Sequence, residues 1–298
     1  MSDLWSVYII ALTVLTIVAT LWFLYRTAKM RVDKTPAADT KTTGHVWDGD
    51  LREYNNPLPR WWMVLFYLTV FFSIGYLVLY PGLGAFDGVL GWSSTARYDS
   101  EMAQAEARYG PVFAAFAARP IDELQSDSQA LAAGYNLFVN ECAQCHGSDG
   151  RGAHGFPNLA DDDWLWGGDA ATIQTTITGG RQGLMPPWGP ALGDAGVAEV
   201  TAYVRSLSDL DHDPELAAAG QARFALFCVA CHGADGKGNP LLGAPNLTDG
   251  IWLYDASEAT IADIVRTGRA NQMPAFADRL GAERIHVLAA YVKSLATQ

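Results

Sequence analysis

One five-residue pattern occurs twice in the sequence, and it constrains the fold more than any other feature. Residues 142–146 read Cys-Ala-Gln-Cys-His and residues 228–232 read Cys-Val-Ala-Cys-His, so the two copies use all four cysteines of the chain. Each copy lies at the same place in one of two matching sequence repeats. Two cysteines separated by two residues and followed at once by histidine form the attachment signature of c-type haem.

Haem attachment explains why each of these residue types is present. The two thiols add to the two vinyl groups of one haem, and the short spacing between them fits the edge of the macrocycle. The adjacent histidine then lies under the iron and binds it through a neutral imidazole nitrogen. The pattern therefore predicts two haem c groups. The predicted attachment residues are Cys142, Cys145, Cys228 and Cys231, and the predicted proximal iron ligands are His146 and His232.

Three other uses of the cysteines remain as alternatives. Zinc ribbons usually separate their two cysteine pairs by roughly 15–20 residues, whereas Cys228 follows Cys145 by 83 positions. Four thiolates would also not require the histidines. A thioredoxin-like dithiol lies near a βαβ pattern, and no such pattern surrounds either pair. Plain disulfides across two residues would be strained and would leave the histidines unexplained.

Only two methionines follow the haem motifs, and both are candidates for the sixth iron ligand. Met185 and Met273 lie 39 and 41 residues after the proximal histidines, at equivalent places in the repeats, and each is followed by proline. A thioether ligand raises the reduction potential relative to a second histidine, and proline stiffens the loop that carries it. His154 and His212 are the alternative ligands. An iron with both axial positions filled has no open site for oxygen, so its chemistry is one-electron transfer.

Other repeated positions indicate how each haem could be enclosed. Gly134 and Gly220 stand eight residues before the first cysteine of each motif, and Phe138 and Phe224 stand four residues before it. On one face of a helix, the glycine would permit close helix contact and the ring would cover the haem edge. Each repeat also ends in an amphipathic helix, at residues 198–207 and 285–295.

Two further residue pairs could contact the haems. Trp164 and Trp252 are candidate pocket walls or simply core aromatics. Arg181 and Arg269 precede the methionine loops and could pair with haem propionates, although surface arginines need no such role.

Two long uncharged segments indicate a membrane protein. Residues 4–25 and 61–80 contain no charged side chain, and only 17% of the whole chain is charged. A helix of 22 residues spans about 33 Å, which exceeds the hydrocarbon core of about 30 Å. A secretory signal peptide is the alternative for the first segment, but Met1-Ser2-Asp3 provides no basic region and no small-residue cleavage site follows. A buried core helix is the alternative for the second. We expect two retained transmembrane helices.

The charge distribution predicts the orientation and the kind of partner. Short loops rich in lysine and arginine stay cytoplasmic, which would place both haem motifs in the periplasm, where bacteria attach c-type haem. Residues 87–298 hold 26 acidic and 13 basic residues, a net of −13. This charge argues against nucleic acid, and it suits either a basic partner protein or simple solubility. The basic residues of the loop are Arg26, Lys29, Arg31, Lys34, Lys41, Arg52 and Arg60.

The N-terminal region carries a more specific resemblance. Residues 44–62, the uncharged segment that follows and Tyr80-Pro-Gly-Leu-Gly84 resemble the N-terminal region of the CcoP/FixP subunit of cbb3-type cytochrome c oxidases. The resemblance covers essentially the whole chain, because the two haem motifs stand where that family carries its two haems and residues 4–25 match its two-span variants. Within this region, His45 is interpreted as a surface loop histidine rather than a ligand or proton site.

The resemblance implies a function and further contacts. In this family the subunit passes electrons from a soluble cytochrome c to a mono-haem subunit and then to a haem–copper catalytic subunit, which reduces oxygen and pumps protons. The resemblance also implies crossed N- and C-terminal helices in each cytochrome c fold, with the carbonyls of Pro157 and Pro245 holding the proximal histidines. Alternatives are a dihaem subunit of another periplasmic complex and, less in keeping with the sequence, a haem gas sensor or peroxidase-like enzyme.

Taken together, the sequence predicts an all-α chain of two transmembrane helices followed by two tandem class I-like cytochrome c domains. In the linker we expect a helix from Tyr98 to Tyr109, broken by Gly110-Pro111, and a short apolar piece over residues 112–118. The predicted segments are a first span (1–30), a cytoplasmic loop (31–60), a second span (61–86), a periplasmic linker or collar (87–128) and two haem domains (129–209 and 210–298).

Overall fold

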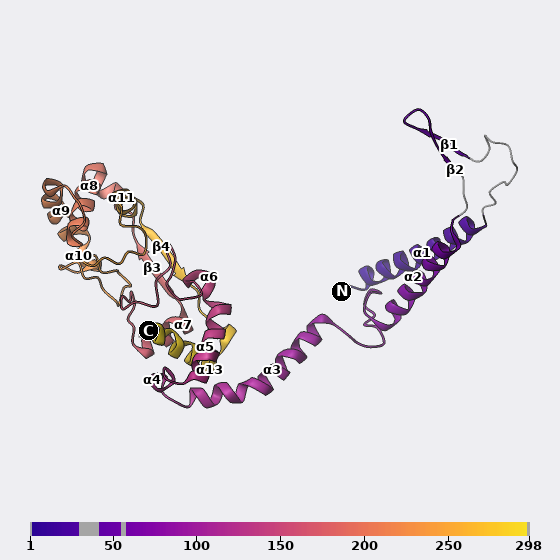
Figure 1. Cartoon of the computed structure of the whole chain (residues 1–298), viewed down its shortest axis with the longest axis horizontal. Helices are drawn as coiled ribbons and strands as arrows, with labels where there is room; N and C mark the ends of the chain where they lie inside the picture. Colours follow the sequence, from indigo (N-terminus) through magenta and orange to yellow (C-terminus); the bar gives the residue numbers. More distant parts are fainter. Residues whose placement is uncertain (1, 30–41, 55–57, 297–298) are drawn as a thin grey trace. The chain divides into compact units, whose positions relative to one another are not determined.

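The computed structural model describes residues 2–29, 42–54 and 58–296 (Figure 1). Much of the predicted cytoplasmic loop, including Arg31, Lys34 and Lys41, lies outside the described residues, as does the Asn55-Asn56-Pro57 part of the turn before the second span. The chain divides into two compact units, Met1–Glu106 and Ala107–Gln298. Most of the described residues are helical, as the sequence predicts.

The N-terminal unit contains two long apolar helices that pack against each other, α1 (Asp3–Ala28) and α2 (Arg60–Leu79). Their mean hydropathies over 18 residues are 2.4 and 2.1, and almost none of their residues are buried by the rest of the protein. Both are therefore long and apolar enough to cross a membrane. The loop after α2 is tied to α1, because Ser6 Oγ accepts a hydrogen bond from the Ala85 N–H at 2.9 Å.

A β-hairpin precedes α2, which the all-α prediction did not include. Strand β1 (Thr42–Trp47) pairs antiparallel with β2 (Leu51–Tyr54). Asp48 and Gly49 form the turn with φ angles of 49° and 89°, and an Asp-Gly pair is a strong hairpin signal in a sequence. His45 lies in β1, exposed, with its ring stacked on Trp47.

The linker helix is longer than the sequence predicts. Helix α3 (Ser94–Ala117) continues through Gly110 and Pro111, so the predicted break between Tyr109 and Val112 is wrong. Proline removes one hydrogen-bond donor from a helix and crowds the preceding turn. Because α3 buries none of its residues, the carbonyl that loses its donor can be hydrated by water instead.

The C-terminal unit contains ten further helices of the described chain and one small sheet. Strands β3 (Arg181–Met185) and β4 (Arg269–Met273) pair antiparallel. The helices are α4 (Ile121–Leu124), α5 (Ser128–Glu141), α6 (Ala143–His146), α7 (Ala170–Gly179), α8 (Gly189–Leu207), α9 (Pro214–Phe227), α10 (Val229–His232), α11 (Glu258–Thr267), α12 (Ala277–Leu280) and α13 (Ala282–Leu295).

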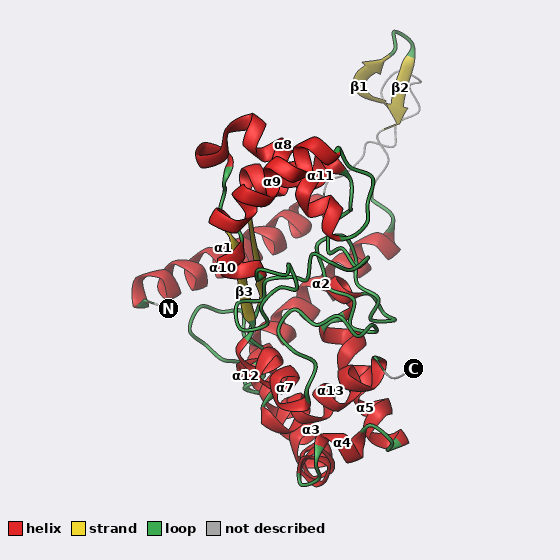
Figure 2. Ribbon diagram, turned by 90° about the vertical axis from the view of Figure 1, so that its left-hand side faces the viewer, coloured by secondary structure: helices red, strands yellow, loops and turns green. Residues whose placement is uncertain are grey.

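These helices form two lobes that do not coincide with the two sequence repeats (Figure 2). Helix α5 packs against α13, and α9 packs against α8. We call the group of α4–α7, α12 and α13 lobe 1, and the group of α8–α11 lobe 2. The resemblance implied that the first and last helices of each repeat cross within that repeat. The structure shows the crossings, but each helix that leads into a haem motif crosses the terminal helix of the other repeat.

The repeated glycines permit these crossings, as the sequence predicts. A Cβ atom on Gly134 would lie 2.5 Å from the Tyr291 Cβ, and one on Gly220 would lie 2.0 Å from the Glu199 carbonyl oxygen. The following phenylalanines are buried against the same partner helices. The ring centroids of Phe138 and Tyr291 are 5.4 Å apart, and those of Phe224 and Tyr203 are 5.2 Å apart.

Candidate haem sites

Each haem motif forms a single helical turn directly after a capped helix. The Asp127 carboxylate accepts hydrogen bonds from two backbone N–H groups at the start of α5, and Asp213 does the same for α9. The motifs follow as α6 and α10. Gly147 and Gly233, both with φ of 76°, then turn the chain away, which only glycine does without strain. The two thiols and the histidine of each motif are thereby held on one short turn.

Both predicted proximal histidines are oriented through the same ring nitrogen. His146 Nδ1 lies 2.9 Å from the Pro157 carbonyl oxygen, and His232 Nδ1 lies 3.1 Å from the Pro245 carbonyl oxygen. A carbonyl can only accept, so Nδ1 carries the proton and Nε2 is left as the metal-binding nitrogen. Burial lowers the pKa of both histidines, which favours the neutral ring that a metal ligand requires.

The four cysteines are free thiols in two separate lobes. Cys145 and Cys231 are exposed, whereas Cys142 is half-buried and Cys228 is buried. Burial raises the pKa of Cys142 to about 12 and that of Cys228 to about 11. Cys142 packs on the lobe 1 core and Cys228 belongs to the lobe 2 core. The two pairs therefore do not meet in one four-thiolate site, and the zinc-ribbon alternative has no structural support.

Each lobe also contains one of the candidate methionines. Met273 packs on the lobe 1 core and Met185 packs on the lobe 2 core. The alternative histidines lie elsewhere. His154 is exposed with its ring edge-on to Tyr254, and His212 Nδ1 is 2.7 Å from the Leu210 carbonyl oxygen. The packing therefore favours the methionines as axial ligands.

The two candidate propionate-binding arginines have other partners in this structure. Arg181 donates to the Thr176 hydroxyl at 2.9 Å. Arg269 donates to Asp263 at 2.7 Å and to the Gly268 carbonyl at 2.7 Å. Both arginines are thus the first residues of the strands that carry the methionines, and each donates hydrogen bonds to protein groups.

The aromatic rings on which these arginines lie were not predicted from the sequence. The Arg181 guanidinium is 4.9 Å from the centroid of Trp166, and that of Arg269 is 5.3 Å from the centroid of Tyr254. The two aromatic residues are 88 positions apart, as are the two arginines. The equal spacing of these two pairs could have identified the aromatic residues from the sequence.

The residues present fit a haem in each lobe. The four thiols are free, and both histidines are held by a proline carbonyl. In addition, Trp252 Nε1 is buried without any hydrogen-bond partner, although Trp252 packs on the lobe 2 core as its counterpart Trp164 packs on the lobe 1 core. A buried, unpaired donor is costly in a folded protein, and an oxygen of a bound group such as a haem propionate would satisfy it.

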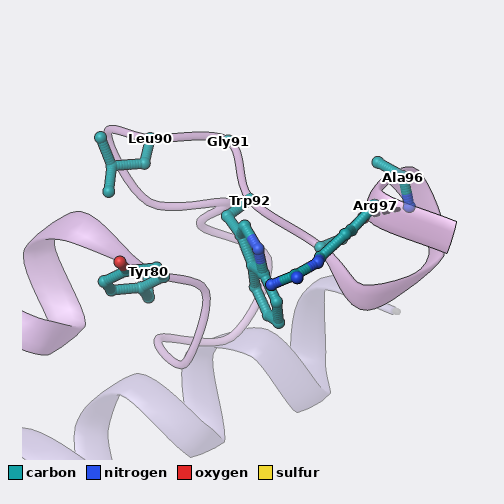
Figure 3. Close-up of a pocket in the computed structure, with 7 residues that line it drawn as sticks. Tyr80, Leu90, Gly91, Trp92, Ala96 and Arg97 are labelled. Carbon is teal, nitrogen blue, oxygen red and sulfur yellow. Dashed lines mark hydrogen bonds between the residues drawn. The ribbon is translucent and has the colours of Figure 1, made fainter. Parts of the chain in front are cut away.

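Two cavities lie outside these motif turns. One of about 330 Å³ lies between the proximal loops of the two repeats and is lined in part by Pro157, Pro245 and Trp252. The other, of about 400 Å³, lies at the end of α2, where the loop through Leu90 folds back and Trp92 meets Tyr80 edge-on at 6.0 Å (Figure 3). It contains none of the predicted site residues.

Comparison with known proteins agrees with this geometry. Residues 39–87 match the family described as the N-terminal domain of cytochrome oxidase-cbb3, FixP. Residues 129–204 and 215–292 each match cytochrome c oxidase, cbb3-type, subunit III. The chain belongs to the CcoP/FixP family of cbb3-type cytochrome c oxidase subunits. The resemblance stated from the sequence is thereby confirmed.

Individual members of the CcoP/FixP family are similar over nearly their full length. The chain is 49% identical to the CcoP subunit of Rubrivivax gelatinosus, over 98% of this chain and 94% of that protein. It is 45% identical to the FixP subunit of Bradyrhizobium sp. strain ORS 278 and 43% identical to that of Sinorhizobium medicae, in both cases over 86% of this chain and 94% of the relative. The chain is thus a membrane-associated subunit of an oxidoreductase complex, with cytochrome c-type domains.

Proposed function

We propose that this CcoP/FixP chain is a membrane-anchored dihaem electron carrier. It takes electrons from a soluble periplasmic cytochrome c and passes them, one at a time, through its two haems. The next carriers are the mono-haem subunit and then the haem–copper catalytic subunit, which reduces oxygen to water and pumps protons. One observation carries the proposal: each lobe contains a carbonyl-held histidine and a methionine, the two residue types that could together hold a haem iron without an open site.

The residues of the chain have distinct tasks in this proposal. A bound haem supplies one-electron chemistry. Each motif cysteine would hold the haem covalently by addition of its S–H across a vinyl group, in which no atom is lost. His146 and His232 would hold the iron through Nε2, and Met185 and Met273 would hold it through sulfur. The carbonyls of Pro157 and Pro245 keep each imidazole in one tautomer and orientation.

The propionates require polar partners. We assign Trp252 Nε1 as a donor to the haem of lobe 2, and Arg181 and Arg269 as propionate-pairing residues. Arg269 would then exchange its bond to Asp263 for one to the haem. Since Asp263 is about half exposed, water can replace the arginine at low cost.

The membrane helices set the location of this chemistry. With α1 and α2 spanning the bacterial inner membrane, the basic residues between them keep that loop cytoplasmic, and both haem sites face the periplasm. Tyr80 and Trp92 lie where the chain leaves α2, a position typical of aromatic side chains at the membrane–water boundary. The acidic surface of residues 87–298 suits a donor with a basic face.

The experiment is a redox titration of the purified full-length chain, with its absorption spectrum and carbon monoxide binding. We expect two covalently retained haems, uptake of two electrons per chain and six-coordinate low-spin spectra in both oxidation states. Carbon monoxide should not bind the reduced chain. Binding of carbon monoxide at either haem would instead favour a gas sensor or peroxidase-like role, and haem extracted by acidified acetone would refute covalent attachment.

A further inference from the structure

The cavity at the end of α2 lies apart from all the haem-binding residues. It has a volume of about 400 Å³ and opens where the chain leaves the second membrane helix. We propose that it binds the headgroup of an anionic phospholipid with one phosphodiester, of the phosphatidylglycerol type, from the periplasmic leaflet of the membrane. The inference rests on the proposed function, because it takes α1 and α2 to span that membrane.

The walls of the cavity are fixed by backbone hydrogen bonds. The Val89 N–H donates to the Val78 carbonyl at 2.9 Å, and the Leu90 N–H donates to the Leu79 carbonyl at 3.0 Å. Both carbonyls belong to the last turn of α2, where a helix leaves its acceptors unpaired. Gly88 permits this return of the loop, because a Cβ atom there would lie 2.5 Å from the Leu79 carbonyl oxygen. The cavity is therefore preformed by a loop that is tied to the helix.

One charged side chain lines the cavity, and it is a cation. Arg97 Nε donates to Glu101 at 2.9 Å, and the two side chains are 67% and 62% exposed. Among the described residues, neither terminal nitrogen of this guanidinium has a hydrogen-bond acceptor. A guanidinium binds phosphate through two parallel N–H donors, so Arg97 can hold a phosphodiester and keep its bond to Glu101. The lining residues are Tyr80, Leu90, Gly91, Trp92, Ser93, Ala96 and Arg97.

The Arg97 guanidinium lies beside the aromatic residues of the cavity. Figure 3 shows the Arg97 side chain extending from α3 toward Trp92, whose ring meets Tyr80 edge-on. Tyrosine and tryptophan at the end of a membrane helix lie at the level of the lipid headgroups. The cation is thus placed at the depth where a lipid phosphate lies.

The polar groups of the cavity favour a negatively charged headgroup over a zwitterionic one. Ser93 Oγ accepts a hydrogen bond from the Ala96 N–H at 3.0 Å, so its own O–H proton can be donated to a phosphate oxygen. No carboxylate lines the cavity, and Glu101 is already paired with Arg97. The ammonium group of a zwitterionic lipid would therefore find no charged partner there.

A column of aromatic rings leads from the cavity along the membrane helix. The ring centroids of Phe72 and Tyr76 are 6.3 Å apart, those of Tyr76 and Tyr80 are 4.9 Å apart, and those of Tyr80 and Trp92 are 6.0 Å apart. The first three rings share one face of α2, on which Phe72 and Tyr76 are 72% and 45% exposed. An acyl chain can lie against this face, whereas free phosphate would gain nothing from it. The aromatic column is the reason to assign a lipid as the source of the phosphate.

The test is native mass spectrometry of the full-length holoprotein in detergent, after removal of co-purified lipid. The probes are phosphatidylglycerol, phosphatidylcholine with the same acyl chains, and inorganic phosphate. We expect one phosphatidylglycerol per chain to bind more tightly than phosphatidylcholine, and excess inorganic phosphate should not displace it. Arg97→Gln should weaken the binding of phosphatidylglycerol about tenfold, because it removes a charge-assisted hydrogen bond. Arg97→Lys keeps the charge and loses the paired donors, so its loss should be smaller.

Arg108→Gln is the matched control, since it makes the same change on the same helix outside the cavity. The Arg108 guanidinium lies 5.3 Å from the centroid of the Tyr109 ring. This variant should bind phosphatidylglycerol as the parent does. An equal loss in the Arg97 and Arg108 variants would show only general attraction to anionic lipid and would overturn the site. Equal binding of the two lipids, or displacement by inorganic phosphate, would overturn the assignment of the ligand.

The lipid site and the proposed function fail in different ways. If alkaline carbonate releases the chain from membrane vesicles, α1 and α2 do not anchor it, and both proposals are wrong. If the chain resists extraction and has two low-spin haems, but Arg97→Gln binds phosphatidylglycerol as tightly as the parent does, only the lipid site is wrong.

Discussion

At the scale of single residues, two glycines determine how closely the lobe helices pack. Gly134 and Gly220 stand where α5 crosses α13 and where α9 crosses α8. At Gly220 the nearest atom is a backbone carbonyl oxygen, which cannot rotate away as a side chain can. At Gly134 the nearest atom is the Tyr291 Cβ, which is also fixed to the backbone. Any side chain at either position must push the two helices apart.

We therefore expect Gly220→Ala to lower the free energy of unfolding of the C-terminal unit by about 1–3 kcal/mol, the usual cost of overpacking. Denaturant unfolding of the holoprotein measures this change. Gly179→Ala is the matched control, because its Cβ would meet nothing within 4 Å and alanine favours a helix. Equal stability of the Gly220 and Gly179 variants would contradict the close crossing.

Asp163, an acidic side chain beside the proximal loops, has a raised pKa. Asp163 lines the cavity between these loops, and burial, followed by the charges of Asp249 and Asp161, raises its pKa. A folded-state pKa above the unfolded value means that the folded chain binds the proton more tightly. Ionisation of Asp163 therefore destabilises the fold as the pH rises above the unfolded pKa of about 3.9.

We expect Asp163→Asn to raise the thermal unfolding midpoint at pH 7, and we expect this gain to shrink as the pH falls to about 4. Scanning calorimetry of the variant and the parent at both pH values measures it. Asp162→Asn makes the same charge change at an exposed neighbour and serves as the control. A gain that is constant with pH would show that the carboxylate is not the cause.

At the scale of elements, α3 and the β3–β4 ribbon depart most from local sequence preference. Helix α3 contains an internal proline and fully buries no side chain. Apart from its last turns, where Phe113 lies under Arg284 and Phe116 packs on the lobe 1 core, its helicity depends on backbone hydrogen bonds and propensity. The ribbon consists of two five-residue strands that are 88 positions apart in the sequence. Neither strand forms a hairpin with its neighbours, so only the approach of the two repeats creates the sheet.

Because Pro111 is the weak point of α3, Pro111→Ala should stabilise this helix by up to about 3 kcal/mol. The measurement is hydrogen exchange of the backbone amides on either side, which should slow in the variant. Ala103→Gly, at an exposed position of the same helix, should have the opposite effect of about 1 kcal/mol. Unchanged exchange in both variants would mean that α3 is not helical in solution.

At the scale of the whole molecule, both repeats contribute chain to both lobes of the C-terminal unit. Lobe 1 takes α5 from the first repeat and α13 from the second, while lobe 2 takes α8 from the first and α9 from the second. Lobe 2 is the continuous segment α8–α11, and both of its connections to lobe 1 run through the paired strands β3 and β4. Unfolding of either lobe therefore disturbs a sheet that the other lobe also holds. Two domains joined by a single flexible linker would not be coupled in this way.

We expect Phe138→Ala and Phe224→Ala, one in each lobe core, to lower the midpoint of one shared calorimetric transition of the C-terminal unit. Each variant should lose about 3–5 kcal/mol of the free energy of unfolding. Both side chains are at most 2% exposed. Leu226→Ala, on α9 and 79% exposed, is the control and should change little. Two separate transitions, with a shifted midpoint only for the lobe that carries the substitution, would contradict the coupling of the two lobes.

The sequence by itself determined the chemistry of this protein. The motif spacing predicts the haem-attachment turns, the uncharged segments predict α1 and α2, and the repeated glycines predict where a close helix crossing occurs, because each of these signals lies within a short stretch of sequence. The Asp48-Gly49 hairpin was also readable, although it was not predicted.

Only the tertiary structure decided which repeat completes which lobe. The two repeats are so similar that Met185 and Met273 carry equivalent local signals, and α8 and α13 present equivalent faces. Local preference therefore cannot distinguish a helix that packs on its own repeat from one that packs on the other. The choice depends on long-range contacts, namely the antiparallel β3–β4 ribbon and the contacts of the two Met-Pro turns with Gly180 and Gly268, which exist only once both repeats are folded together.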